Sequence, residues 1–330
     1  MSRFLIKRLL MAFLTLFLIS VVTFGLFFLV PSNAAWLQCG KNCTPERIAQ
    51  VEKTLGIDRP IYEQYANYMK GIVTGRTFDD PGQQVRECPA PCLGFSFTRR
   101  EPVTDILARG IPITLSIVGG AFVIYIAVGV GLGMLSALRK GTVFDRAAIA
   151  ASLGFASTQI YTLGLVLLLI FVYTLKILPN PGYTPITQNP LAWAGGMLMP
   201  WITLGLINSA AYARLSRAQM LETVSEDYVR TARAKGLPGR KVYGRHALRA
   251  AITPIVTIAG IDLGTQLGGV AITESVFALN GIGRLAVQAV NDLNMPVVMA
   301  TVLISSVFVV VANIVVDVLY AVIDPRVRLS

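Results

Sequence analysis

ETVSEDYVRTARAKGLPGRKVYGRHALRAAITP, residues 222–254, is the polar stretch around which this chain of 330 residues is organised. It carries seven Lys or Arg and three acidic residues, and an apolar run lies on each side of it. The whole chain is 54% hydrophobic and 14% charged, with a mean hydropathy of +0.62. A water-soluble protein of this length is rarely so apolar, so the composition predicts an integral membrane protein that presents a basic loop.

Six apolar runs are candidates to cross the bilayer core, which is about 30 Å thick and needs about 20 helical residues. The first run follows Arg3, Lys7 and Arg8. A signal peptide cleaved after the small residues 33–35 is the alternative for it, but the run is longer than a usual signal sequence. The fourth run has a short apolar centre, so five or seven spans are the alternative counts. We predict an all-α integral membrane protein with six transmembrane helices, over residues 9–30, 111–138, 147–175, 198–212, 250–273 and 297–323.

Basic residues gather at the N-terminus, in alternate connections and at the C-terminus. With this assignment, the short segments on one side hold 17 Lys or Arg, counting Arg214 and Arg217, against Lys176 and Arg284 in the short loops of the other side. Cytoplasmic loops are enriched in Lys and Arg, so both termini are predicted to be cytoplasmic. Orientation thus accounts for the net charge of +11 and argues against nucleic-acid binding.

Four parts follow from this orientation: a first transmembrane helix (1–30), an extracytoplasmic loop forming a small helical subdomain (31–110), a five-helix core (111–323) and a cytoplasmic tail (324–330). The outer loop has nearly balanced charge, with ten Lys or Arg and nine acids. Thr44 and Pro45 predict the start of a short helix reaching Leu55, and apolar spacing predicts a second helix over residues 60–72. This loop is a surface-packed hairpin or a docking platform for a partner.

Four cysteines lie in the outer loop, in two Cys-x-x-x-Cys pairs. Exported thiols usually oxidise, so disulfides are expected, with the pairing left open; a zinc site is the weaker alternative for this spacing. No metal site is predicted elsewhere. The disulfide candidates are Cys39, Cys43, Cys88 and Cys92.

The sequence lacks the residue clusters that an enzyme or an ATPase would need. His246 is the only histidine in the sequence, and it lies in the basic loop between Arg245 and Arg249. The sequence has no G-x-x-x-x-G-K-[ST] phosphate-binding loop, so we expect no catalytic residue, no bound cofactor and no ATP hydrolysis in this chain. Only Asp262 and Asp317 lie clearly inside apolar runs, which is few for a proton-coupled secondary transporter, the alternative from another class.

Residues that start and stop helices distinguish the basic loop from an irregular, solvated connection. Ser225 is the predicted N-cap of a helix beginning at Glu226, with acids in its first turn and bases in its last. Gly236 is the predicted C′ residue, and Pro238 prevents continuation. A second helix then resumes and enters the membrane near Pro254. A short, rigid helix on the inner membrane face is a candidate coupling element.

Glycines recur every four residues in two of the predicted spans. The pair Gly129 and Gly133 predicts close packing of helices within the chain. Gly260, Gly264 and Gly268 in the fifth span either pack within the chain or line a pathway or a subunit interface. Polar residues beside them are candidates for a translocation pathway: Asp262, Gln266, Thr273 and Glu274.

The basic loop also resembles a known family. Asp227-Tyr-Val-Arg-Thr-Ala-Arg-Ala-Lys-Gly-Leu237, followed by Arg245-His-Ala-Leu-Arg249, is similar to the cytoplasmic signature of permeases of binding-protein-dependent ABC importers, in the dipeptide/oligopeptide/nickel branch. Ordered similarities continue along nearly the whole chain. They include Leu55-Gly-Ile-Asp-Arg-Pro60, Ala213-Arg-Leu-Ser-Arg217, Glu274-Ser-Val-Phe277, Gly281-Ile-Gly-Arg-Leu285 and Asp324-Pro-Arg326.

The sequence departs from the family pattern at three places. Arg230-Thr-Ala232 replaces the Glu-Ala-Ala of the general permease signature, which is the form of the peptide branch. Asn280-Gly281 replaces a Pro-Gly in an outer turn. The outer loop also has an insertion with Cys88 and Cys92 where a short segment is usual.

The resemblance implies a type I importer permease that moves di- or oligopeptides by alternating access in the inner membrane of a prokaryote. It also implies a homologous second permease, two ATPases that bind ATP and Mg²⁺, and an extracytoplasmic solute-binding protein; nickel, glutathione and haem are the alternative cargoes. The helix within residues 222–237 would dock in an ATPase cleft. The residues implied in that contact are Glu226, Asp227, Tyr228, Arg230, Thr231, Ala232, Ala234, Lys235 and Gly236.

Overall fold

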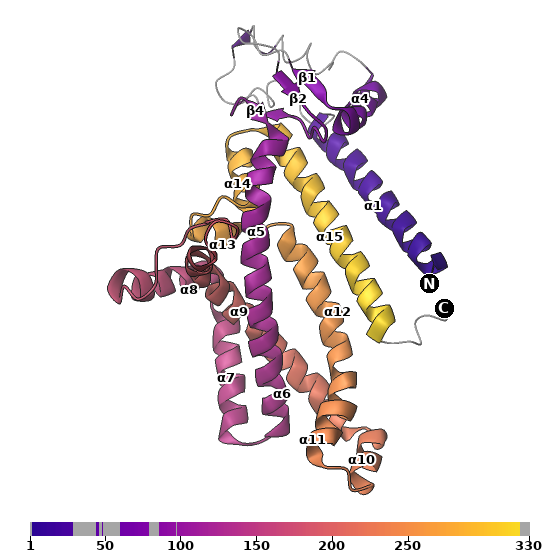
Figure 1. Cartoon of the computed structure of the whole chain (residues 1–330), viewed down its shortest axis with the longest axis vertical. Helices are drawn as coiled ribbons and strands as arrows, with labels where there is room; N and C mark the ends of the chain where they lie inside the picture. Colours follow the sequence, from indigo (N-terminus) through magenta and orange to yellow (C-terminus); the bar gives the residue numbers. More distant parts are fainter. Residues whose placement is uncertain are drawn as a thin grey trace. The chain divides into compact units, whose positions relative to one another are not determined.

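The computed structural model describes residues 2–28, 44–45, 48, 60–78, 86–96 and 98–323, and these residues are mostly helical. They fall into two compact units. Unit 1 comprises Met1–Thr114, Leu267–Ala271 and Asn280–Val310, and unit 2 comprises Leu115–Gln266, Ile272–Leu279 and Val311–Ser330. Helices α5 (Val103–Tyr125), α12 (Leu248–Leu267) and α15 (Met295–Ile323) contribute residues to both units (Figure 1).

Candidate membrane spans in the described residues agree with the predicted count. Five helices are long and apolar enough to cross a bilayer, and a bent pair would make a sixth. The bent pair is Val143–Ser157 with Ile160–Thr174, whose axes differ by 102°. The five single helices are Ile6–Phe27, Val103–Leu138, Pro190–Ser225, Gly239–Leu267 and Met295–Val318.

Unit 1 combines helices with two short antiparallel hairpins. The predicted helix 60–72 is confirmed as α4, whereas the predicted helix after Thr44 lies mostly outside the described residues. The purely helical subdomain is therefore an incomplete prediction: strands of two or three residues are too short to show an alternating pattern. Beyond the shared helices α5 and α15, the elements are α1 (Ser2–Phe28), α4 (Ile61–Thr74), β1 (Arg76–Phe78), β2 (Arg86–Cys88), β3 (Phe95–Ser96), β4 (Glu101–Pro102) and α14 (Ile282–Asn291).

Strand β1 pairs with β2, with Arg76 opposite Cys88, and β3 pairs with β4, with Phe95 opposite Pro102. The backbone N–H of Val103, at the start of α5, donates to the Gly94 carbonyl at 3.0 Å. The hairpins thus lead directly into α5.

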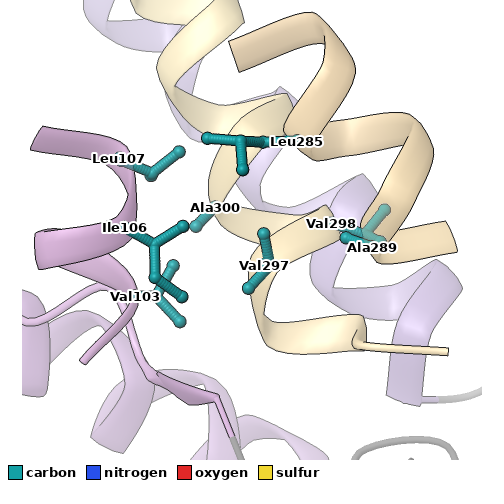
Figure 2. Close-up of a cluster of buried hydrophobic side chains, with 8 residues drawn as sticks. All are labelled: Val103, Ile106, Leu107, Leu285, Ala289, Val297, Val298 and Ala300. Atoms are coloured by element: carbon teal, nitrogen blue, oxygen red, sulfur yellow. The ribbon is translucent and has the colours of Figure 1, made fainter. Parts of the chain in front are cut away.

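The core of unit 1 lies where α5, α14 and α15 meet (Figure 2). Residues three and four apart share one face of a helix, which explains why α5 presents three apolar side chains together. All eight side chains of the cluster are buried. They are Val103, Ile106 and Leu107 of α5, Leu285 and Ala289 of α14, and Val297, Val298 and Ala300 of α15.

Helix α1 is joined to α4 by aromatic packing. Phe24 contacts the rings of Tyr65 and Tyr68, with centroids 5.4 and 5.7 Å apart. The hydroxyls of Ser20 and Tyr65 are hydrogen-bonded at 2.6 Å. The remaining apolar face of α1 is exposed, as a lipid-facing helix requires.

Unit 2 is built around the 36-residue helix α9 (Pro190–Ser225). Asn189 caps this helix by accepting hydrogen bonds from the backbone N–H groups of Leu191 and Ala192 at 3.1 Å. The predicted fourth span, 198–212, is thus only the middle of a longer helix. Helix α9 packs against η1, α6, α7 and α8. Besides α12, the other elements are η1 (Ile126–Val130), α6 (Gly131–Leu138), α7 (Val143–Ser157), α8 (Ile160–Leu167), η2 (Leu168–Thr174), α10 (Asp227–Ala234), α11 (Gly239–Lys241), η3 (Val242–Ala247) and α13 (Ala271–Val276); the three η segments are π-helical.

Glycines allow the η1–α6 segment to lie close to α9. A Cβ atom on Gly129 would come within 2.8 Å of the Ser209 carbonyl oxygen, and one on Gly133 would collide with Ala213 and Ser216. The predicted packing role of Gly129 and Gly133 within the chain is therefore confirmed.

Two predicted spans are wrong as continuous helices. The third breaks after Ser157, because Thr158 is extended with φ −89° and ψ 130°. The fifth ends at Leu267 instead of residue 273, because Gly269 has φ +129°, a conformation open mainly to glycine. Gly260 packs within the chain, since a Cβ atom there would collide with the Val316 side chain of α15.

Candidate functional site

Helix α10 coincides with the predicted coupling helix. Its N-cap is Glu226, which is extended with φ −67° and ψ 146° and is also the C-cap of α9. The prediction of Ser225 as N-cap is wrong: Ser225 still belongs to α9, and its hydroxyl donates to the Glu222 carbonyl at 2.6 Å. Only this one residue separates the two helices.

The predicted stop of α10 is confirmed. Gly236 has φ +74°, and its N–H donates to the Arg233 carbonyl at 2.9 Å. Pro238 then precedes α11, which continues through η3 into α12. The basic side chain of Arg233 lies in the last turn and Asp227 in the first, so both complement the helix dipole.

One face of α10 is anchored in an apolar cluster. Val229 is fully buried and Ala232, three residues later, is 7% exposed. Their cluster joins five elements, because its other members are Ala137 of α6, Met220 of α9, Val242 and Ala247 of η3, and Ala251 of α12. Helix α10 is therefore packed against several other elements of unit 2.

The opposite face of α10 is exposed and charged. Arg230 and Asp227 form a loose ion pair of 3.8 Å, which contributes little at such exposure. Partial burial raises the pKa of Tyr228, and the nearby Glu226 carboxylate raises it further. Of the nine predicted contact residues, Ala232 alone is buried in the cluster; the exposed ones are Glu226, Asp227, Tyr228, Arg230, Thr231, Ala234, Lys235 and Gly236.

A second feature of unit 2 is an ion pair between α7 and α9. Arg217 donates from Nε to Asp145 Oδ1 at 2.7 Å and from Nη2 to Oδ2 at 2.9 Å. The Ser136 hydroxyl and the Gly141 N–H, 2.9 Å away, also donate to this carboxylate. The side chain of Asp145 is only 4% exposed. Four donors thus fix the turn between α6 and α7 to α9, close to the start of α10.

The sequence analysis missed the Asp145–Arg217 pair. The usable signal was Arg217, a cation placed among small and apolar residues near the end of a predicted span. Nothing in the sequence alone indicated that its partner is 72 residues away.

A polar cluster lies inside the spans of unit 2. The Tyr212 hydroxyl donates to Asp262 Oδ2 at 2.7 Å, and the rings of Tyr212 and Tyr125 lie 5.0 Å apart. Gln266 follows Asp262 by one helical turn, so both occupy the same side of α12. The two tyrosines of this cluster were not predicted, because aromatic residues in apolar runs are more often packing residues.

The other two predicted pathway residues lie elsewhere. Thr273 and Glu274 belong to α13, where they are 2% and 0% exposed. The break at Gly269 separates them from α12, so the four pathway candidates do not lie on one helix as the sequence suggested.

Cys88 and Cys92 form a disulfide, as expected for the outer loop. Cys39 and Cys43 lie outside the described residues. The loop closed by the disulfide joins α4 to α5, since the Cys92 N–H donates to the Ile72 carbonyl at 3.3 Å and Thr104 donates to the Pro91 carbonyl at 2.6 Å. No group of three or more possible metal ligands occurs within the described ranges.

Two family models match this sequence. The model "Binding-prot-dependent transport system membrane comp, N-term" matches residues 1–118, and "Binding-protein-dependent transport system inner membrane component" matches residues 129–329. The second match covers α10, the Asp145–Arg217 ion pair and, of the polar cluster, Tyr212, Asp262 and Gln266.

Relatives match over their whole length. The dipeptide transport system permease protein DppB of Escherichia coli (strain K12) is 32% identical over 352 aligned positions, which cover 99% of both chains. A relative in Brucella abortus (strain 2308), named for a peptide transport system permease, is 33% identical over 328 positions and 99% of both chains.

Among solved structures, a chain of the MetNI methionine ABC transporter, in inward-facing conformations, is similar in fold. The TM-score is 0.50 at 19% identity, covering 67% of this chain and 97% of that chain. The chain is thus a multi-pass membrane protein of the type I permease fold. It belongs to the family of binding-protein-dependent transport system inner membrane components, in the dipeptide and oligopeptide branch of ABC importer permeases.

Proposed function

We propose that this chain is the permease subunit of an ATP-driven importer that carries di- and oligopeptides across the inner membrane of a bacterium. The observation that carries the proposal is the geometry of α10, which has one face buried against four other elements and the other face exposed and charged. The peptide cargo is supported by the names of the relatives in Escherichia coli and Brucella abortus.

The proposed complex contains a homologous second permease, two ATPase subunits and a solute-binding protein. ATP and Mg²⁺ bind to the ATPase subunits, and this chain binds no cofactor. The exposed face of α10 lies in a cleft of one ATPase, and the extracytoplasmic segment between α1 and α5 meets the binding protein.

Coupling then proceeds through α10. Closure of the ATPases on ATP displaces this helix, and the Val229–Ala232 face transmits the displacement to α9 and to η3 and α12. Because both flanking helices move with α10, the spans change between inward-open and outward-open arrangements. Peptide released by the binding protein enters in the outward-open state.

Co-purification is the direct test of this assembly. Tagged permease extracted in mild detergent should retain the two ATPases and the second permease, and the liganded binding protein should stimulate ATP hydrolysis and peptide uptake in proteoliposomes. Nickel, glutathione and haem serve as alternative cargoes in the same assay. Recovery of the chain alone, with uptake driven by a proton gradient, would instead indicate a secondary transporter.

The role of α10 is tested by Ala232→Pro. Proline inside a helix costs about 3 kcal/mol, so α10 should lose its rigidity while the spans still insert. Val143→Pro, at the exposed first position of α7 where proline is tolerated, is the matched control. ATP-driven uptake should be lost in the Ala232→Pro variant and kept in the control. Normal uptake in both variants would refute the proposed role of α10 as a rigid coupling helix.

A further inference from the structure

Asp262 is a carboxylate inside a membrane-spanning helix. It lies on α12 between Gly260 and Gly264, within the apolar span Gly239–Leu267. Ionisable residues at such positions are costly, and they usually face a pathway or a partner group of opposite charge. Asp262 is half-buried, which leaves part of its side chain open to a group that approaches α12.

No cation of unit 2 is paired with Asp262 among the described residues. Ion pairs between described residues include Arg109 with Glu101, Arg217 with Asp145, and Arg230 with Asp227. The Tyr212 hydroxyl supplies one hydrogen bond of 2.7 Å, which does not neutralise a charge. The carboxylate is therefore suited to a positive group that comes from outside the chain.

Two further polar atoms in the cluster make no hydrogen bond of normal geometry to the described residues, although the side chains that carry them lie within reach of each other. They are the hydroxyl of Tyr125, whose side chain is fully buried, and the amide oxygen of Gln266. Buried polar atoms are rarely left without a well-formed hydrogen bond, so two in one cluster are unusual for a purely structural role.

An ammonium group matches this set of atoms. It carries one positive charge and three N–H donors and accepts no hydrogen bond. Asp262, the Gln266 amide oxygen and the Tyr125 hydroxyl oxygen are three acceptors, and one of them is negatively charged. The ring faces of Tyr125 and Tyr212 also favour a cation nearby.

We propose that Asp262, Gln266, Tyr125 and Tyr212 form a transient site for the α-ammonium group of a peptide during translocation. This inference rests on the proposed peptide cargo. The site selects for a free amino terminus inside the membrane, in addition to any selection by the binding protein. In the structure the Tyr125 side chain is fully buried, so its hydroxyl becomes accessible only when the spans separate.

Tyr125→Phe is the sharpest test. The hydroxyl makes no well-formed hydrogen bond, so its removal should leave folding nearly unchanged. A hydrogen bond to a charged group is worth about 1.5–3 kcal/mol, so kcat/KM for uptake should fall by about tenfold or more. Thr203→Val is the matched control, because its buried hydroxyl also lacks a well-formed hydrogen bond to the described residues but lies on α9 outside the cluster.

The assay uses the complete importer in proteoliposomes, with the radiolabelled dipeptide glycylphenylalanine as probe. Asp262→Asn should show a larger loss than Tyr125→Phe, while stimulation of ATP hydrolysis by the liganded binding protein persists. Peptide uptake by Tyr125→Phe at the wild-type rate would overturn the ammonium site. An equal loss in Thr203→Val would also overturn it. So would loss of the second permease from purified Asp262→Asn, because the cation would then belong to that partner.

The two proposals fail in different ways. If the wild-type importer moves no peptide, the peptide cargo is wrong and the ammonium site falls with it. If wild-type uptake is normal and both cluster variants match it, only the ammonium site falls.

Discussion

Replacing Arg217 by alanine removes both hydrogen bonds of its guanidinium to Asp145 and leaves a carboxylate with 4% exposure without its cation. Breaking a buried pair in this way costs about 3–5 kcal/mol. The Ser136 hydroxyl and the Gly141 N–H still donate to Asp145, so we expect the lower end, about 3 kcal/mol. Arg217→Lys keeps the charge but loses the two-pronged geometry, so its cost should be about half as large.

Unfolding of the purified permease by denaturing detergent, followed by near-ultraviolet circular dichroism, measures this loss. Arg214→Ala is the matched control, because this neighbour on α9 makes a 3.0 Å bond to the Ser152 carbonyl and should cost about 1 kcal/mol. The double variant Asp145→Ala/Arg217→Ala should recover much of the loss, since no charge is left buried. A loss below 1 kcal/mol for Arg217→Ala, or no recovery in the double variant, would refute the reasoning.

Three further predictions concern packing, covalent links and ionisation. Gly133→Ala should lose about 1–3 kcal/mol by overpacking against α9, whereas Gly131→Ala, with open space around it, should gain up to about 1 kcal/mol; the same unfolding assay compares them. Cys92→Ser removes the disulfide that closes the five-residue loop from Cys88, so the free energy of unfolding should fall by about 2 kcal/mol. The segment between α4 and α5 should then be cleaved faster by a protease than in the wild type. Equal cleavage of the wild-type protein with and without reductant would contradict this. Burial raises the pKa of Tyr68 to about 12, so unfolding releases a proton above pH 10 and stability falls from there towards pH 12; Tyr68→Phe should show a smaller fall in that window.

Local signals predicted α10 well and its surroundings poorly. Gly236 and Pro238 end the helix by their own backbone preferences, which a sequence displays directly. The predicted N-cap is one residue too early. The Ser225 hydroxyl donates to the Glu222 carbonyl within α9, and Glu226 is the N-cap of α10. Such a choice depends on where α9 stops, which local propensity leaves open.

The membrane spans and the polar cluster were also predicted only in part. Hydropathy located six apolar segments, but it carried no information on the extended Thr158 or on the left-handed Gly269 that end two of them. The site at Asp262 was half predicted: the carboxylate stands out in an apolar run, while Tyr125 and Tyr212 do not. Their contribution depends on tertiary packing that brings α5, α9 and α12 together within unit 2.

Glu226 ends α9 and begins α10, and this shared residue has a mechanical consequence. A linker of several residues would let the two helices move independently. The junction here adds only the two backbone dihedrals of Glu226, which limits how far α10 can move without the 36-residue helix α9. In the proposed mechanism, this short connection acts together with the buried Val229–Ala232 face.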